Sequence, residues 1–178
     1  MTDISQIVAP LTVQADEQVE WPPLQLRVHT YLTTTLPPLG LVTSVRALVR
    51  QDDQILVVRD PISVHILPGG RREPAETLLQ TLEREVLEET GWMLRDMRPL
   101  GLVHFHHLTS KPSDYRYPYP DFLHVVYVAT ADRYDARQRE VEGYELDAGF
   151  QLLTTVMMLP LSRGERVFLG AFAQMLEA

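Results

Sequence analysis

Three glutamates stand close together near the middle of the chain, and their carboxylates could bind a divalent cation. Glu88 and Glu89 follow Glu85 by three and four residues, so on a helix the three side chains gather on one side. Like charges at these spacings cost a helix about 0.2–0.5 kcal/mol per pair, so stability alone does not explain the cluster. Carboxylate oxygens are the ligands that a hard cation such as Mg²⁺ prefers. The spacing therefore indicates a metal site on a helix.

The helix that carries these glutamates is predicted to begin at Pro74 and to end at Gly91. Proline suits a first helical position, where its missing N–H would have no partner. Glycine tolerates the left-handed conformation that closes many helices. An apolar stripe at helical spacing should face the core; it consists of Leu78, Leu79, Leu82 and Val86.

The stretch from Gly70 to Trp92 resembles the signature box of the Nudix hydrolases, G-x5-E-x7-R-E-U-x-E-E-x-G-U, in which U is a bulky apolar residue. The box is matched by Gly70, Glu76, Arg84, Glu85, Val86, Glu88, Glu89, Gly91 and Trp92. Trp92 stands where the family usually has an aliphatic residue. The alternative is a solvated acidic helix face beside a Gly-Gly turn, but nine constrained positions at fixed spacing favour the box.

The resemblance implies a Nudix-type pyrophosphohydrolase that cleaves the diphosphate bond of a small nucleoside diphosphate derivative. A nucleoside triphosphate, a nucleotide sugar and a dinucleotide all fit. It implies Mg²⁺ or Mn²⁺ held by Glu85, Glu88, Glu89 and the Gly70 carbonyl, with water attacking phosphorus. Arg84 would orient a glutamate such as Glu88 rather than touch the substrate.

A catalytic base outside the box is a further implication, because several relatives carry one on the loop before the penultimate strand. Glu145 is preferred there to Glu142, and both could instead be surface charges. A nucleotide-sensing module with the same fold but no turnover is the alternative function. A prenyl-diphosphate isomerase shares the fold but needs a reactive cysteine, and this chain has none.

Arginine, histidine and tyrosine side chains outside the helix are the candidates for substrate binding. Arg46 and Arg59 could hold phosphate oxygens. His104 and His106 could serve as neutral hydrogen-bonding groups near the sugar or phosphates. Tyr115, in a proline-rich loop with two further tyrosines, could stack on a nucleobase. Solvated arginines, ordinary strand histidines and a purely structural loop are the simpler alternatives.

Composition bounds the partners. The 178 residues include 16 basic and 24 acidic side chains, a net charge of −8, which argues against a nucleic acid polymer. A small phosphorylated molecule is still allowed, because bound metal neutralises its charge locally. Apolar runs are shorter than a membrane span, and the acidic N-terminus is the reverse of a secretory signal. We therefore expect a cytoplasmic protein with no membrane partner; a homodimer stays open.

The expected fold is α/β (α+β), an α/β/α sandwich with a mixed sheet. Residues 41–178 should form the Nudix hydrolase domain, and residues 1–40 an N-terminal extension that packs on it. Within the extension, Trp21 is expected to pack, with ligand stacking as the alternative. Strands are predicted at residues 44–50, 54–59, 62–67, 100–107, 121–131 and 150–153, and a closing helix from residue 157, broken at Pro160 and resumed over 163–176.

Overall fold

The computed structural model describes residues 4–139 and 146–177 of the chain. Its elements in chain order are α1 (Ile4–Val8), β1 (Ala15–Trp21), β2 (Leu24–Leu32), the 3₁₀ turn η1 (Leu39–Leu41), β3 (Val42–Gln51), β4 (Gln54–Arg59), β5 (Val64–His65), β6 (Gly69–Arg71), α2 (Leu78–Thr90), β7 (Trp92–His107), β8 (Asp121–Tyr134), β9 (Asp147–Leu152), α3 (Leu153–Val156) and α4 (Arg163–Glu177).

The strands form one curled mixed sheet in the order β1-β2-β7-β8-β3-β4-β5. Two short strands join it at the side: β6 pairs with β3, and β9 pairs with β4. Among the described strands, β3 and β8 run parallel and the other pairs are antiparallel. With helices on both faces, this confirms the predicted fold class.

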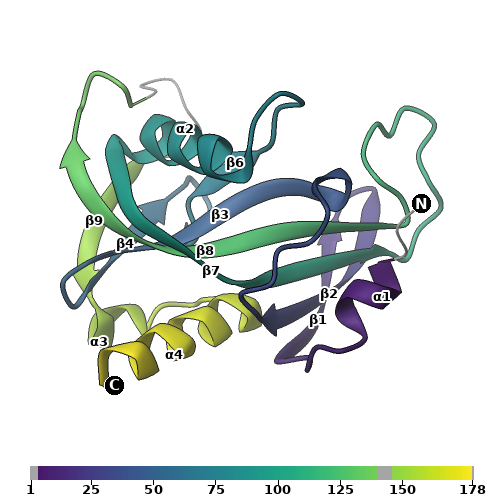
Figure 1. Cartoon of the computed structure of the whole chain (residues 1–178), viewed down its shortest axis with the longest axis horizontal. Coiled ribbons are helices and arrows are strands. Elements are labelled where there is room, and N and C mark those ends of the chain that lie inside the picture. The colour runs from purple at the N-terminus through teal and green to yellow at the C-terminus, as the bar shows by residue number, and fades with distance from the viewer. Residues whose placement is uncertain (1–3, 140–145, 178) are drawn as a thin grey trace.

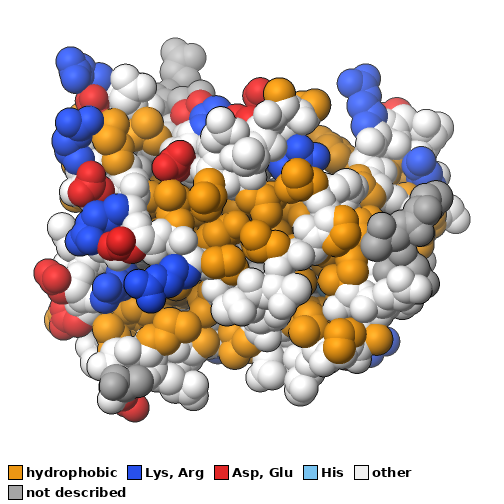
Figure 2. Space-filling model, viewed as in Figure 1, with side chains coloured by type: hydrophobic (Ala, Val, Ile, Leu, Met, Phe, Trp, Pro, Cys, Tyr) orange, Lys and Arg blue, Asp and Glu red, His pale blue; other side chains and the backbone are white. Residues whose placement is uncertain are grey.

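The helices cover opposite faces of the sheet: α2 lies on one face, and α3 and α4 lie on the other (Figure 1). Alternate residues of β3 point to opposite faces. Val45 packs with Leu82 and Val86 of α2, whereas Leu48 packs with Phe168 of α4. In the same view, hydrophobic side chains gather over the middle of the molecule and charged ones toward the left edge (Figure 2).

The start of α2 differs from the prediction. The helix begins at Leu78 rather than at Pro74, with Thr77 as its N-cap. The Thr77 hydroxyl accepts from the Gln80 N–H, and the Gln80 side chain accepts from the Thr77 N–H, a capping box that satisfies two end groups at once. Gly91 closes the helix in the left-handed region, at φ 78°, as predicted. Leu79 is 41% exposed, because it lies outside the buried stripe.

Other helix and strand boundaries also differ from the prediction. The strand predicted from residue 100 begins eight positions earlier, at Trp92, so α2 leads into β7 through Gly91 alone. The strand predicted over residues 62–67 is reduced to Val64–His65. The closing helix begins at Arg163, and the helical turn before it covers Leu153–Val156 rather than starting at residue 157. None of the helices in the described ranges is long and apolar enough to span a membrane.

Residues 15–32 continue the sheet. β2 pairs along its length with β7, from Leu26 opposite His107 to Leu32 opposite Gly101, and β1 pairs with β2 at the edge. The described N-terminal segment therefore belongs to the same sheet as the glutamate helix. The division of the chain at residue 40 into an extension and a domain stays a proposal.

Candidate active site

Three of the four glutamates of the signature box, Glu85, Glu88 and Glu89, lie on α2, beside the short strand β6. Gly70 of β6 approaches Glu85 so closely that a Cβ at this position would overlap the Glu85 carboxylate. A side chain at position 70 would therefore displace the Glu85 carboxylate from its present place. The Glu85 side chain is 18% exposed, so it is largely enclosed between α2 and β6.

Arg84 is the centre of a hydrogen-bond network that joins the loop, β6 and α2. Its Nε and Nη2 donate to the two oxygens of Glu76, at 2.6 and 3.0 Å. Its Nη1 donates to Glu85 at 2.9 Å and to Glu88 at 3.2 Å. Nη2 also donates to the Arg71 carbonyl at 3.1 Å. The expected contact between Arg84 and Glu88 is present, and Arg84 holds two other carboxylates as well.

The carboxylates in this network differ in proton affinity. The hydrogen bonds from Arg84 lower the pKa of Glu76 from 4.5 to about 2, and the Thr81 hydroxyl, which donates to Oε2 at 2.8 Å, adds to the effect. Burial raises the pKa of Glu85, against the opposing influence of Arg84. A partly desolvated carboxylate of this kind gains most from a nearby cation.

Glu89 faces the loop rather than Arg84. Its Oε2 accepts from the Gly69 N–H at 2.8 Å, and its backbone carbonyl accepts from Arg139 Nε at 3.2 Å. Glu89 thus ties the C-terminal half of α2 to the start of β6.

The donor set fits a hard divalent cation in its chemistry. Glu85, Glu88, Glu89 and the Gly70 carbonyl offer only oxygen atoms, which suits Mg²⁺. In the part of the chain that the structure describes, no three His, Asp or Glu side chains converge on a ready cation position, and Arg84 engages two of the three carboxylates. Arg84 occupies one oxygen of each, Oε1 of Glu85 and Oε2 of Glu88, so the other oxygen of each carboxylate would be left for a cation.

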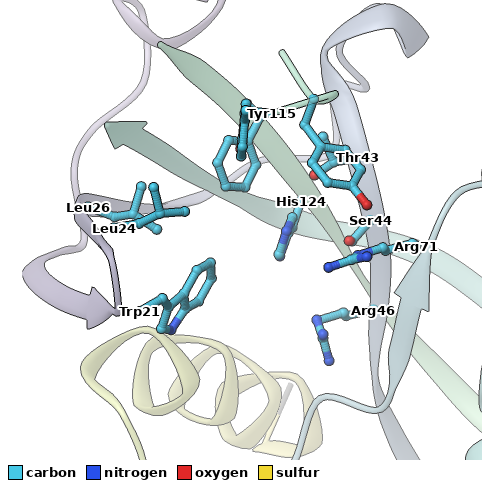
Figure 3. A pocket seen from close by; sticks show the side chains of 11 residues that line it. Trp21, Leu24, Leu26, Thr43, Ser44, Arg46, Arg71, Tyr115 and His124 are labelled. Atoms are coloured by element: carbon cyan, nitrogen blue, oxygen red, sulfur yellow. The ribbon is translucent and has the colours of Figure 1, made fainter. Parts of the chain in front are cut away.

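A cavity of about 220 Å³ opens on the other side of β3 and β6. Arg46 of β3 and Arg71 of β6 point into it, with His124 of β8 beside Arg71 and Trp21 across from them (Figure 3). The positive charge of Arg46 acts on Glu85, so the cavity and the glutamates are electrostatically coupled across the β3–β6 pair. The lining is completed by Leu24, Leu26, Thr43, Ser44, Tyr115, Tyr117 and Phe122.

The tyrosine loop contributes two of its rings to this cavity. Tyr115 and Tyr117 line it, and the guanidinium of Arg71 lies 5.0 Å from the Tyr117 ring centroid. The Tyr115 hydroxyl is 2.9 Å from His107 Nε2, which fixes the ring. Tyr119 instead donates to the Thr109 carbonyl and anchors the loop.

His104 and His106 lie away from the cavity. One ring nitrogen of each histidine lies within hydrogen-bond distance of the same oxygen of Asp121: His104 Nε2 at 2.7 Å and His106 Nδ1 at 2.8 Å. Phe105, between them in β7, points to the face that carries the cavities, and strand alternation turns its neighbours to the opposite face. The structure therefore does not bring these histidines to Arg46. Arg59, exposed at the end of β4, is also not among the residues that line the cavity.

His124 is the pocket histidine that sequence reasoning missed. It lies within the apolar run of β8, and pairs opposite Val103 of β7. Burial lowers its pKa well below the usual value, and the charges of Arg46 and Arg71 lower it further. It is therefore a neutral hydrogen-bonding group near neutral pH. Within a continuous apolar run, no sequence signal says which face a histidine takes.

The predicted base, Glu145, and its alternative, Glu142, lie outside the described residues. Both precede β9 in the chain, whose first pair joins Asp147 to Arg59 of β4. Their role stays a proposal.

A family model, described as the NUDIX domain, matches residues 40–166, more than half of the chain. The chain belongs to the NUDIX domain family. The resemblance seen in the signature box is thereby confirmed. Trp21, Leu24 and Leu26, which line the cavity, precede the matched range, so this NUDIX protein builds part of its pocket from a segment outside the family model.

Curated relatives of this NUDIX chain carry the name "NAD-capped RNA hydrolase NudC". The protein from Enterobacter sp. (strain 638) is 34% identical over 90 residues, which cover 49% of this chain and 30% of the relative. The protein from Salmonella agona (strain SL483) is 30% identical over 116 residues, or 63% of this chain and 39% of the relative. The matched part thus spans only 30 to 39% of the length of these relatives.

Solved structures share the fold. The Bacillus subtilis pyrophosphohydrolase BsRppH has a TM-score of 0.54 at 16% identity, and the match covers 76% of this chain and 77% of that one. The NUDIX domain of Shewanella oneidensis NrtR, solved with ADP ribose, also has a TM-score of 0.54, at 21% identity, and covers 78% and 90%. At these identities the likeness concerns the fold alone.

Proposed function

We propose that this NUDIX protein is a divalent-cation-dependent pyrophosphohydrolase that cleaves the diphosphate bond of a small nucleoside diphosphate derivative. The observation that carries the proposal is the pairing of an all-oxygen glutamate cluster on α2 with a cavity that presents Arg46 and Arg71 across the β3–β6 pair. Family membership supports the enzyme class that the signature box predicted.

The glutamates and the loop would hold Mg²⁺ or Mn²⁺. Glu85, Glu88, Glu89 and the Gly70 carbonyl are the protein ligands in this proposal. When bound, the cation supplies charge screening of the diphosphate and a more acidic water. Arg84 acts as a positioning residue, because it holds Glu85 and Glu88 from one guanidinium.

The cavity would hold the nucleoside half. Arg46 and Arg71 would anchor phosphate oxygens, with planar guanidinium groups suited to that geometry. Tyr115 and Tyr117 would stack on the base, which contributes about 1–3 kcal/mol per base. His124 would donate or accept a hydrogen bond as a neutral ring, taking the part first expected of His104 and His106.

The substrate class draws support from the names of the relatives. They include an NAD-capped RNA hydrolase and a domain solved with ADP ribose, both of which involve a nucleoside diphosphate linked to a further group. The net charge of −8 favours a small molecule over an RNA polymer. The activity of the curated relatives on NAD-capped RNA makes that polymer a substrate to be tested rather than one to be set aside.

A release assay tests the proposal. The chain is incubated with nucleoside triphosphates, nucleotide sugars, dinucleotides and an NAD-capped RNA oligomer, each with Mg²⁺, with Mn²⁺ and with EDTA. We expect cation-dependent release of a nucleoside monophosphate from at least one small substrate, with slower cleavage of the RNA. No release from any compound, or release unchanged by EDTA, would contradict the proposal.

A nucleotide-sensing module is the alternative function, since the cavity with Arg46 and Arg71 could bind a nucleotide without turnover. Such a module would bind the same compounds without cleaving them. Binding by calorimetry with no release in the assay above is the result that would decide for it.

A further inference from the structure

A second cavity adjoins the first. It has a volume of about 310 Å³ and lies between the sheet and α4. Three residues line both cavities: Trp21, Arg46 and His124. The two spaces therefore meet at one junction, and a ligand that fills both must pass Arg46.

The second cavity is apolar on most of its walls. Val19, Val28, Val103, Phe105 and Phe168 line it. An apolar cavity of about 150 Å³ already accepts a benzene molecule, so this one has room for a larger ring. Trp21, whose ring centroid is 5.4 Å from that of Phe105, offers an aromatic wall to both spaces.

One polar group in this cavity lacks a partner. The Thr30 side chain is buried, with the residue 1% exposed, and its hydroxyl makes no hydrogen bond to any described residue. A Cβ at Gly164 would lie 2.7 Å from this oxygen, so the glycine keeps the space above it open. A buried unpaired hydroxyl costs free energy, and a polar ligand atom would satisfy it.

The rim of the second cavity disfavours anions. Glu17 and Glu165 line it, and both are engaged with backbone N–H groups: Glu17 with Gly164 and Glu165 with Ile66. A phosphate would meet these carboxylates, whereas an uncharged ring would not. The cation nearest to the junction is Arg46, which is also the one whose charge reaches Glu85.

We propose that the two cavities bind the two ring-bearing ends of one ligand, with its bridging diphosphate at Arg46. The substrate class is then a diphosphate that joins two nucleoside-like groups, rather than a nucleoside triphosphate. The first cavity takes a base against Tyr115 and Tyr117. The second takes an uncharged ring with a polar atom for Thr30. This inference rests on the proposed function and narrows it.

Binding without turnover tests the inference. The full chain carrying Glu89→Gln, with Mg²⁺ present, is titrated calorimetrically with diadenosine diphosphate, which has a ring group at both ends, and with ADP, which has one. We expect the two-ended ligand to bind about tenfold more tightly or better, as one additional stacked ring provides. Equal affinities would overturn the inference.

Two variants separate the cavities. Val19→Phe, which fills the second cavity from the edge strand, should remove the advantage of diadenosine diphosphate and leave ADP affinity within about twofold. Val13→Phe is the matched control, because Val13 is exposed, and should change neither affinity. Thr30→Val should weaken only the two-ended ligand, with an unchanged or higher thermal midpoint, because an unpaired buried hydroxyl is removed.

The outcomes distinguish the two proposals. If the variants weakened the binding of both ligands equally, or of neither, the second cavity would not be a subsite, and the proposed hydrolytic activity would be unaffected by that result. If the protein instead bound diadenosine diphosphate more tightly than ADP but the parent protein hydrolysed no substrate, only the proposed activity would be contradicted.

Discussion

The guanidinium of Arg84 donates hydrogen bonds to both carboxylate oxygens of Glu76, from Nε to Oε1 at 2.6 Å and from Nη2 to Oε2 at 3.0 Å. Glu76 lies in the loop before α2, and Arg84 lies two turns along the helix. The pair therefore fixes the loop against the helix and aims the remaining nitrogen of Arg84 at Glu85 and Glu88. Two positions of the signature box are thus explained by one contact.

Glu76→Gln should destabilise the protein by about 1–3 kcal/mol at neutral pH, because a charge-assisted pair loses one of its charges. The free energy of unfolding, from urea titration, measures the effect. Glu83→Gln is the control, since Glu83 is an exposed residue of the same helix. Equal stability of the two variants at neutral pH would contradict this role for Glu76.

The stability difference should also depend on pH. Folding lowers the pKa of Glu76 from 4.5 to about 2. A lowered carboxyl pKa contributes stability that is fully present above about pH 4.5 and is lost as the pH falls toward about 2. The gap between parent and Glu76→Gln should therefore be constant near neutral pH and should narrow below about pH 4.5. If the stability difference widened on acidification, the pKa of Glu76 would be raised by folding rather than lowered, which would contradict this prediction.

Gly70→Ala should lower turnover and cost about 1–3 kcal/mol of stability, because the new methyl group would overlap the Glu85 carboxylate. Gly149→Ala is a matched control: it also lies in a strand, and nothing approaches a Cβ there within 4 Å. Steady-state rates and thermal midpoints of both variants make the comparison. If Gly70→Ala matched the control in both, close approach of β6 to Glu85 would not matter for function.

His124→Ala should raise KM, whereas His106→Ala should leave it unchanged. His124 lines both cavities, while the His106 side chain is 43% exposed and lies against Asp121. Because burial and two arginines keep the pKa of His124 well below its usual value, KM should show no titration by this residue near pH 6.5. A larger KM effect from His106 would return the pocket to the other face of the sheet.

Some parts of the fold and site could be read from local sequence, and others could not. Gly91 closes α2 as expected, because a left-handed C-cap is a local property of glycine. The prediction that α2 begins at Pro74 was wrong. The helix begins at Leu78, because Thr77 and Gln80 form a reciprocal cap that outweighs the preference of Pro74 for a first helical position. The threonine and the glutamine three residues later are a local signal for this start of the helix.

The faces of strands are a different matter. Alternation in residues 102–107 correctly separates His104 and His106 from Phe105, but it cannot say which face meets α4 and the cavities. That choice depends on the pairing of β7 with β2 and β8, which joins segments far apart in the sequence. Trp21 and His124 entered the pocket for the same reason.

Glu145 is predicted to act as the general base. A positioned base contributes about 10²–10⁴-fold to a rate, so Glu145→Gln should lower kcat by about that factor while KM changes little. Glu142→Gln, three residues earlier, tests the alternative base in the same assay. If both variants kept the parental kcat, the base would be a glutamate of the signature box, or the reaction would need none from the protein.

Glu89→Gln gives the most direct test of the metal-dependent hydrolysis proposed here. The amide oxygen of glutamine can still accept from the Gly69 N–H, so the free energy of unfolding should stay within about 1 kcal/mol of the parent. Loss of one cation ligand should lower kcat about 10²-fold or more with Mg²⁺, while Glu83→Gln on the exposed side of α2 keeps the parental rate. A stable Glu89→Gln protein with near-parental turnover would contradict the assignment of the glutamate cluster as the catalytic metal site.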